Sequence, residues 1–378
     1  MDSFVGLVPR NVKGDDHGCD AALGYFPSPG MSLRFGLVGT GGAGRLFAGA
    51  LAMRPGGARL VAVCSRNRDK ATEFAGEHGV SEVFTDWRDL LAAPGIDAVC
   101  LATPTGDHAP MTVAAAARGL HVLTEKPIAT NVADADRMIA ACDEAGVTLG
   151  VIFMYRFMEG ALAMREAVTG GLIGRPLVAE CRDLCFRSQA YYDSAEWRGR
   201  WASEGGGSLV TQTSHILDLM VWMLGDVESV AGFYTTTDLH RIEVEDLTLG
   251  VVRFASGVLA TVASSTATIN PEPRSLVIRG AKGTVGMVDD DLARWDVPGG
   301  PTPRIRRLLE AGSVDRGDTL TSSGYADPTL HFHQMEDFVE AVAEGRPPLV
   351  DGREGRRTMA VMEALYESSR RGEVIRPN

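Results

Sequence analysis

The sequence predicts an α/β protein in which a domain built on a parallel sheet precedes a C-terminal α/β domain with a large open, mostly antiparallel sheet. Short apolar runs alternate with helical segments up to about residue 152, which is typical of a parallel sheet with helices on both faces. From residue 153 onward several strand-like runs follow one another closely, which favours antiparallel or mixed pairing. A length of 378 residues suits two such domains.

The composition excludes several classes of protein. Hydrophobic residues make up 45% of the chain and charged residues 23%, which is ordinary globular usage. No run approaches the roughly 20 apolar residues of a membrane span, so we expect no membrane contact. A net charge of −12 argues against a nucleic-acid partner, because it repels phosphate backbones. Six cysteines without a CxxC pair indicate a reducing compartment, and we expect a cytoplasmic protein.

Residues 1–30 are expected to form a loosely ordered leader. They mix glycine, proline and charge without apolar periodicity, and they lack the basic start and apolar run of a secretory signal. A strand-like run begins directly after Met31, so Met31 is an alternative start of the chain. Neither interpretation assigns chemistry to this segment.

The first domain is predicted to span residues 31–152. Its strands are apolar throughout, as expected when both faces of a parallel sheet are covered. We expect strands at 33–38, 60–64, 97–102, 120–123 and 147–153, a weaker strand at 82–84, and helices at 43–53, 68–77, 107–118 and 131–145.

The second domain is predicted to span residues 153–378 and to serve substrate binding and oligomerisation. One face of its sheet should pack against the first domain and the other against a second copy of the chain, giving a homodimer or homotetramer. We expect strands at 176–185, 227–236, 245–254, 258–267, 274–279 and 283–288, helices at 158–168, 207–224, 331–344 and 354–371, and a long loop at 298–328.

A glycine-rich turn follows the first strand and opens the first helix, with the spacing GxGxxG over residues 39–44. Glycines there permit a tight turn and a close approach to a pyrophosphate at the helix N-terminus. This context predicts a dinucleotide-binding Rossmann domain, although a turn that merely packs helix on strand is the alternative. The expected cofactor contacts are Gly39, Thr40, Gly41, Gly42 and Ala43.

The end of the second strand indicates the preferred dinucleotide. NAD sites usually carry a carboxylate there for the ribose diol, but this chain has Ser65 and Arg66. A guanidinium binds a 2′-phosphate in bidentate fashion, which favours NADP. NAD remains the alternative if Arg66 stacks on adenine or faces solvent.

Four further segments carry a family resemblance. They are the turn Thr103–His108, the run His121–Pro127 ending in Glu-Lys-Pro, the pair Arg156-Phe157, and Gly205-Gly-Gly followed by His215-Ile-Leu-Asp218. Together they resemble the glucose–fructose oxidoreductase / inositol dehydrogenase / rhizopine-catabolism (Gfo/Idh/MocA) family over about residues 33–376. The resemblance implies an NAD(P)-dependent oxidoreductase that moves hydride at a secondary ring carbon of a sugar, amino sugar, sugar nucleotide or cyclitol.

Lys126 is the first candidate catalytic residue. It follows the strand 120–123, so it should lie near the carboxyl ends of the strands, where open α/β sheets bind ligands. Pro127 restricts its backbone, and the resemblance implies a cis bond there. A cation beside a reacting hydroxyl stabilises an alkoxide and shuttles its proton. A surface lysine paired with Glu125 is the alternative.

His215 is the second candidate. Thr211, His215 and Asp218 have the spacing i, i+4 and i+7 and should share one helix face. The family usually carries Asp, sometimes Asn, at the position of Thr211, and the hydroxyl can only exchange a hydrogen bond with substrate. Lys126 and His215 are therefore the expected catalytic pair, with a satisfied core histidine as the alternative for His215.

The resemblance implies further contacts with cofactor and substrate. Thr105 replaces the usual Asn of its turn, a mild departure. Tyr192 belongs to an aromatic stretch that suits sugars, although a packed loop explains it equally well. The implied cofactor contacts are Thr103, Pro104, Thr105, His108, Glu125, Lys126, Arg156, Trp197 and Arg198; the substrate contacts are Lys126, Arg156, Tyr192, Thr211 and His215.

No metal site is expected. His331 and His333 lack nearby cysteines or carboxylates in metal-ligand spacing and are assigned to the start of a packed helix. Two rival functions on the same fold remain open, an NAD-using glycosidase and a non-catalytic dinucleotide-binding sugar sensor. The excess of arginine over lysine suits a GC-rich genome, and modification of an antibiotic sugar is one role such a dehydrogenase could have.

Overall fold

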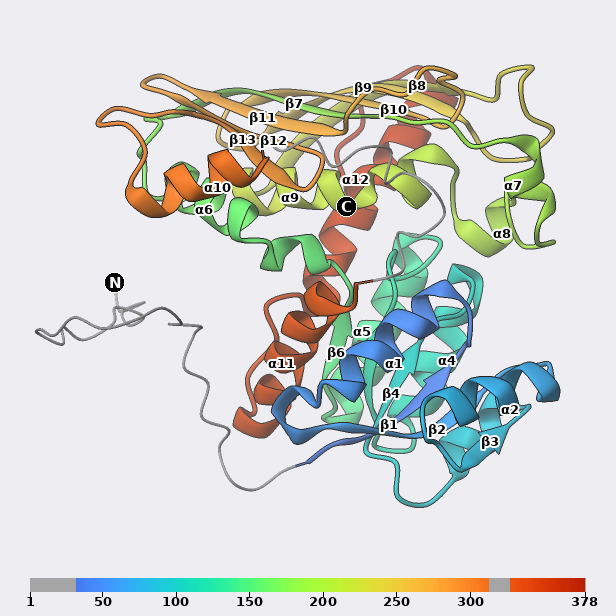
Figure 1. Cartoon of the computed structure of the whole chain (residues 1–378). Helices are drawn as coiled ribbons and strands as arrows, with labels where there is room; N and C mark the ends of the chain where they lie inside the picture. Colours follow the sequence, from blue (N-terminus) through green and yellow to red (C-terminus); the bar gives the residue numbers. More distant parts are fainter. Residues whose placement is uncertain (1–31, 313–326, 378) are drawn as a thin grey trace, which may run out of the picture.

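The computed structural model describes residues 32–312 and 327–377, and it contains two sheets (Figure 1). The expectations for the leader and for residues 313–326 of the long loop lie outside the described residues. Six parallel strands form the first sheet in the order β3-β2-β1-β4-β5-β6. These strands are β1 Arg34–Val38, β2 Arg59–Cys64, β3 Glu82–Phe84, β4 Ala98–Leu101, β5 His121–Thr124 and β6 Leu149–Val151.

Five helices connect these strands, and four of them were expected from the sequence. The fifth, α3, is six residues long, too short for a periodic apolar pattern to reveal. The helices are α1 Gly42–Ala52, α2 Arg68–Glu77, α3 Trp87–Ala92, α4 His108–Ala116 and α5 Val132–Ala145. The crossover connections place every carboxyl end of the sheet at one edge, so the loops after β1, β2, β4 and β5 converge there.

Seven strands form the second sheet in the order β13-β12-β11-β7-β10-β9-β8. Pairing is antiparallel except between β7 and β10, so the sheet is mixed, as expected. Along β9 and β10 buried and exposed residues alternate, which is the pattern of a sheet with one covered face. The strands are β7 Pro176–Leu184, β8 Val227–Thr235, β9 Leu247–Phe254, β10 Leu259–Ser265, β11 Ser275–Gly280, β12 Thr284–Val288 and β13 Asp291–Asp296.

Helices cover the inner face of this sheet and separate it from the first domain (Figure 1). We expected the sheet to pack directly against the first domain, and this expectation is wrong. The inner face of the sheet is apolar and needs a larger apolar partner than the loops at the edge of the first domain provide. Helix α10 and strand β13 were missed; α10 lies inside the expected loop. The covering helices are α6 Glu159–Thr169, α9 Ser214–Leu224, α10 Pro303–Gly312 and α12 Gly352–Arg371.

The segment expected as one helix over 207–224 has two parts. Leu209–Thr213 forms a π-helix, and α9 begins only at Ser214. A π turn widens the backbone spiral, so residues before and after it no longer keep the i, i+4 alignment of an α-helix. This local break lies at the level of Thr211, within the expected site.

Helix α11, Thr329–Glu344, returns to the first domain (Figure 1). The ring of Phe338 lies 6.3 Å from that of Phe35 on β1, centroid to centroid, and Met335 and Val339 join the same buried cluster. The C-terminal segment therefore completes the core of the N-terminal sheet.

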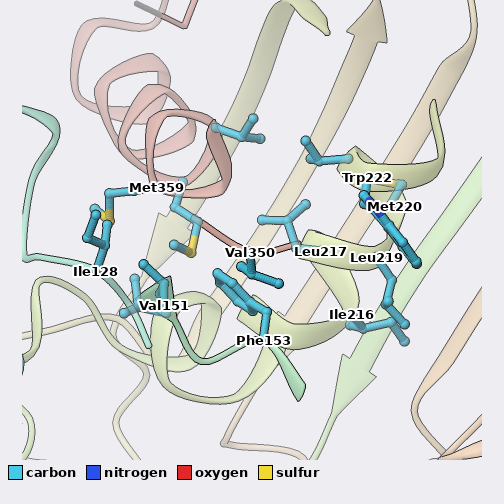
Figure 2. Packing of buried hydrophobic residues seen from close by; sticks show 14 of the residues in the cluster. Ile128, Val151, Phe153, Ile216, Leu217, Leu219, Met220, Trp222, Val350 and Met359 are labelled. Atoms are coloured by element: carbon cyan, nitrogen blue, oxygen red, sulfur yellow. The ribbon is translucent and has the colours of Figure 1, made fainter. Parts of the chain in front are cut away.

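The domain junction is apolar and continuous (Figure 2). Val151 and Phe153, which end the first sheet, belong to the same buried cluster as Leu217 of α9 and Met359 of α12. Such packing holds α9 in a fixed position relative to the carboxyl ends of the first sheet. Among the helices of the described residues, none combines the length and apolar character needed to cross a membrane.

Candidate active site

The glycine turn after β1 has the shape that a bound pyrophosphate requires. Gly39 has φ +102°, and a Cβ there would lie 2.3 Å from the carbonyl oxygen of Ala102. A Cβ on Gly44 would lie 2.1 Å from the Gly39 oxygen, whereas one on Gly41 would meet nothing within 4 Å. Gly41 caps α1 without a side-chain hydrogen bond, so the first-turn N–H groups remain available to an anion. These residues fit a dinucleotide.

The second strand ends at Ser65 and Arg66, as expected. The Ser65 N–H donates to the carbonyl of Phe84 at 3.2 Å, which fixes the turn. Arg66 is exposed, and its guanidinium has no partner among the described residues. The side chain is free to meet a phosphate on the adenosine ribose.

The turn after β4 lies beside the glycine turn. Thr103, Pro104 and Thr105 are half-buried there, and Thr105 begins a short 3₁₀ turn, Thr105–Asp107. Gly106 packs against the loop that follows Trp197 and Arg198, since a Cβ on it would lie 2.5 Å from the oxygen of Ala202. This contact brings the 197–202 segment to the edge of the first sheet.

Lys126 leaves β5 through a cis Lys126–Pro127 bond. Its Nζ donates a hydrogen bond to the carbonyl oxygen of Thr211 at 2.7 Å, joining the first sheet to the π-helix. Loss of solvent around the ammonium lowers the pKa of Lys126, although Glu125, Glu204 and Asp183 oppose the shift. A lysine with a lowered pKa exchanges protons more readily near neutral pH.

His215 lies in α9, where two aromatic side chains contact its ring. Tyr155 stacks on its ring at 4.6 Å, and Phe153 meets it edge-on at 5.9 Å. Burial lowers the pKa of His215 well below its ordinary value, and Lys126 adds to the shift. The imidazole is therefore neutral, and its Nδ1 has no partner within the described chain. Asp218 does not orient it.

Thr211 faces the site through its backbone rather than its side chain. Its carbonyl accepts from Lys126, while its Oγ1 donates to the Gly207 oxygen at 2.8 Å. The hydroxyl oxygen keeps lone pairs for a substrate donor.

Glu125 and His108 hold the Lys126 turn. One oxygen of Glu125 accepts the Lys126 N–H at 3.2 Å, and the other lies 3.2 Å from Nε2 of His331. His108 is fully buried, with its ring nitrogens 3.1 Å from the Pro127 oxygen and 3.0 Å from the Thr103 oxygen. His108 therefore braces two loops, and the engagement of both ring nitrogens argues against the expected cofactor contact.

The surroundings of Arg156 also favour a structural role over the expected contact with cofactor and substrate. Its guanidinium is 1% exposed and donates twice to Asp218 and once to Glu354, each at 2.7 Å. The side chain packs against Trp222, with Cζ 5.2 Å from the ring centroid. Three of its five N–H donors are used inside the protein and the side chain is buried, which argues against a contact of Arg156 with cofactor or substrate.

Tyr192 is buried, and its hydroxyl bonds to Thr266 Oγ1 at 2.8 Å, which favours the packed-loop alternative over the substrate contact. Arg198 lies over the rings of Tyr191 and Trp197, with Cζ 4.1 and 4.4 Å from their centroids. Both Trp197 and Arg198 remain half-buried at the loop surface. Their contact with a cofactor stays a prediction.

Sequence reasoning missed several residues that surround Lys126 and His215. Arg274 lies over the ring of Tyr155, 5.0 Å from its centroid, and pairs with Asp290 at 2.9 Å. Burial raises the pKa of Glu204 to about 7. Asp183 is buried on β7, and the signal for it was present, since a carboxylate occupies an inward position of an alternating strand.

A dinucleotide cradle beside a lysine and a neutral histidine is the arrangement of a nicotinamide-dependent oxidoreductase. A model described as the oxidoreductase family with an NAD-binding Rossmann fold matches residues 33–153, and a GFO/IDH/MocA C-terminal domain model matches residues 161–286. The chain belongs to the Gfo/Idh/MocA oxidoreductase family. The expected family, fold class, enzyme class and nicotinamide dinucleotide cofactor are confirmed.

Three relatives illustrate the similarity. A 1,5-anhydro-D-fructose reductase of Ensifer adhaerens is 34% identical over 60% of this chain and 67% of its own length. An inositol 2-dehydrogenase of Rubrobacter xylanophilus is 30% identical over 90% of this chain and 92% of its own length. The WlbA dehydrogenase of Bordetella pertussis, solved with NADH and UDP-GlcNAcA, is 33% identical with a TM-score of 0.83, covering 91% of this chain and 97% of that chain.

Replacing Arg156 by Met should reduce the free energy of unfolding by about 3–5 kcal/mol, because Asp218 would be left as a buried unpaired carboxylate. Urea unfolding measures the loss. The control is Arg353→Met, whose pair with Asp143 is exposed, with 63% and 53% of the side chains accessible, and which should cost less than about 1 kcal/mol. Unchanged stability with weakened cofactor binding would restore the ligand-contact interpretation of Arg156.

Proposed function

We propose that this oxidoreductase moves hydride between a nicotinamide and a secondary ring carbon of a sugar, sugar nucleotide or cyclitol, with Lys126 and His215 handling the hydroxyl proton. The observation that carries the proposal is the 2.7 Å bond from Lys126 Nζ to the Thr211 carbonyl, which points the amine toward the helix of His215. Relatives named inositol, xylose and anhydrofructose oxidoreductases support a polyhydroxylated ring as substrate.

The nicotinamide, when bound, accepts or supplies the hydride. The residues of the chain itself accept and return the proton. Oxidation of a secondary alcohol releases one hydride and one proton, and the proton passes to Lys126 Nζ or to the imidazole of His215, which is 8% exposed. Both groups have lowered pKa values, chiefly through burial, so each has a neutral form that can accept it. In the reverse direction the same group returns the proton to the alkoxide.

The first probes follow from the relatives. WlbA from Bordetella pertussis was solved with UDP-GlcNAcA, and its 33% identity and TM-score of 0.83, against 24% and 0.78 for a levoglucosan dehydrogenase, make a sugar nucleotide the leading candidate. myo-Inositol, D-xylose and 1,5-anhydro-D-fructose complete the panel, each offered with NAD(H) and NADP(H) and followed by nicotinamide absorbance.

Changing Lys126 to Met should lower single-turnover hydride transfer by about 10²–10⁴-fold, because the proton-transfer group is removed while most side-chain volume stays. Cofactor affinity should hold. Lys70→Met is the matched control, since Lys70 is exposed on α2 and should leave the rate unchanged. An undiminished rate in the Lys126 variant would contradict the proposal and favour a dinucleotide-binding sensor.

We infer a preference for NADP from Arg66. Its guanidinium is unpartnered and exposed at the end of β2, where the adenosine ribose lies in this fold. Either dinucleotide fits the glycine turn, so the preference depends on the 2′-phosphate contact alone.

Arg66→Ala should weaken NADP(H) binding by roughly 10- to 100-fold and leave NAD(H) binding nearly unchanged, since a charge-assisted hydrogen bond is worth about 1.5–3 kcal/mol. Titration of nicotinamide fluorescence measures both affinities. Arg68→Ala, on the exposed first turn of α2, is the control. Equal losses for both cofactors would overturn the preference.

We further propose that the outer face of the second sheet binds another copy of the chain. Within the described residues helices cover only the inner face (Figure 1). Phe233 and Leu249 are cross-strand partners on the outer face, 76% and 52% exposed, and Val251 extends the apolar patch. Apolar patches of this kind mark protein interfaces.

We also propose a cytoplasmic location, which is inferred from the cysteine usage.

Leu249→Glu should convert a dimer or tetramer into monomers, because it places an unpaired charge in the centre of the buried patch. Size-exclusion chromatography with light scattering gives the mass. Leu172→Glu, at an exposed position off the sheet, is the control. A wild-type monomer, or an unchanged mass in the Leu249 variant, would refute this interface.

A further inference from the structure

Asp183 lies beside the residues that carry the proposed chemistry. On β7 it occupies an inward position, in line with buried Ala179 and Cys181. Its partner on β10 is Ser264, whose Oγ accepts a hydrogen bond from Thr213 at 2.7 Å. Thr213 ends the π-helix and precedes α9, so Asp183 is next to the segment that holds Thr211 and His215.

The neighbouring strand brings a cation to the same level. Ser275 of β11 pairs with Arg182, so Arg274 lies opposite Asp183. Arg187 follows β7 and approaches from the other end. Lys126, Arg187 and Arg274 all lower the pKa of Asp183, although burial raises it overall. The carboxyl group thus faces three cations at the centre of the site.

None of these cations contacts Asp183. Within the described residues no ion pair of 4.0 Å or less and no hydrogen bond reaches its carboxylate, although the residue is only 6% exposed. Each cation is bonded elsewhere: Lys126 to the Thr211 carbonyl at 2.7 Å, Arg187 to Gln212 at 2.8 Å and Arg274 to Asp290 at 2.9 Å. A buried carboxylate without a donor is costly, and the cost is removed when a ligand supplies one.

The other carboxylates that act on Lys126 already have donors. Glu125 accepts the Lys126 N–H and lies against His331. Glu204 accepts the N–H of Gly199. Of the three carboxylates that raise the pKa of Lys126, Asp183 alone has its lone pairs unused within the described chain.

We propose that Asp183 is a specificity-determining residue that accepts a hydrogen bond from a substrate hydroxyl adjacent to the reacting carbon. This inference rests on the proposed function. It adds that the site recognises a vicinal diol. In the proposed function Lys126 and His215 handle the hydroxyl being oxidised, so Asp183 is assigned to a neighbouring hydroxyl. A carboxylate has acceptor sites and no donors, which suits a diol.

The test compares Asp183→Asn with wild type in the cofactor-loaded protein. The probe is the panel member that wild type turns over with the highest kcat/KM. We expect KM to rise about 10- to 100-fold with kcat within a few fold, since a charge-assisted bond to bound substrate is lost. Asp296→Asn, at the exposed end of β13 where Asp296 pairs with Arg294, is the control and should leave KM unchanged.

Monodeoxy analogues of that probe identify the contact. The analogue that lacks the contacted hydroxyl should lose affinity with wild type and lose no more with the Asp183 variant, because the two changes remove one bond. Additive losses for every analogue would overturn the proposal. So would an unchanged KM with only a shifted pH dependence of kcat, which would make Asp183 a residue that tunes Lys126.

Failure of the proposed function appears separately, as no nicotinamide turnover by wild type with any probe. Calorimetric titration of the NADH-loaded protein with UDP-GlcNAcA then measures the Asp183 contact without turnover. A loss of about tenfold in affinity in Asp183→Asn supports the contact. Equal affinities of variant and wild type refute it.

Discussion

The buried contact between Arg156 and Asp218 is the interaction on which the site depends. Arg156 lies on the short connection Met154–Phe157 that follows β6, Asp218 lies on α9, and Glu354 opens α12. Three segments distant in sequence are therefore held at one point by hydrogen bonds of 2.7 Å. Burial raises the pKa of Asp218, but the bidentate guanidinium opposes it, and Arg156 holds the pKa of Glu354 below its ordinary value. Once α9 is fixed in this way, the position of His215 follows.

The π-helix before α9 determines how the two domains meet at the reacting centre. In a regular α-helix the Thr211 carbonyl would be committed to a backbone N–H four residues on. Here it accepts the Lys126 ammonium instead, and buried Glu245 accepts the N–H groups of Gly207 and Leu209 at the start of the segment. Irregular helical turns of this type occur at functional sites because they free backbone groups. The broken segment is what lets a loop of the first sheet bond to a helix of the second domain.

The charged groups of the site are arranged so that Lys126 and His215 can exchange protons although the site is buried. Desolvation makes both Lys126 and His215 easier to deprotonate, while Glu125, Glu204 and Asp183 limit the effect on Lys126. Tyr155 contacts both the His215 ring and the Arg274 guanidinium, and the Arg274 charge adds to the lowering of the His215 pKa that burial causes. The carboxylate of Asp183 has no donor within the described chain, so it is a polar group of this site that a substrate would satisfy. Nδ1 of His215 also lacks a partner among the described residues, but protein encloses it.

The local sequence pattern was sufficient to place the functional residues wherever the chemistry depends on residues that are close together in the chain. The turn after β1 requires glycine at positions 39 and 44, and Lys126 lies just after the end of β5, so both features could be placed from the sequence alone. Tertiary structure decided the partners of long side chains. Arg156 meets Asp218 and Glu354 across separations of 62 and 198 residues, and Tyr192 meets Thr266 across 74. Asp183 gains its place from the register of β7 against β10 and β11, which no local pattern specifies, because strand pairing is settled by the packing of whole faces.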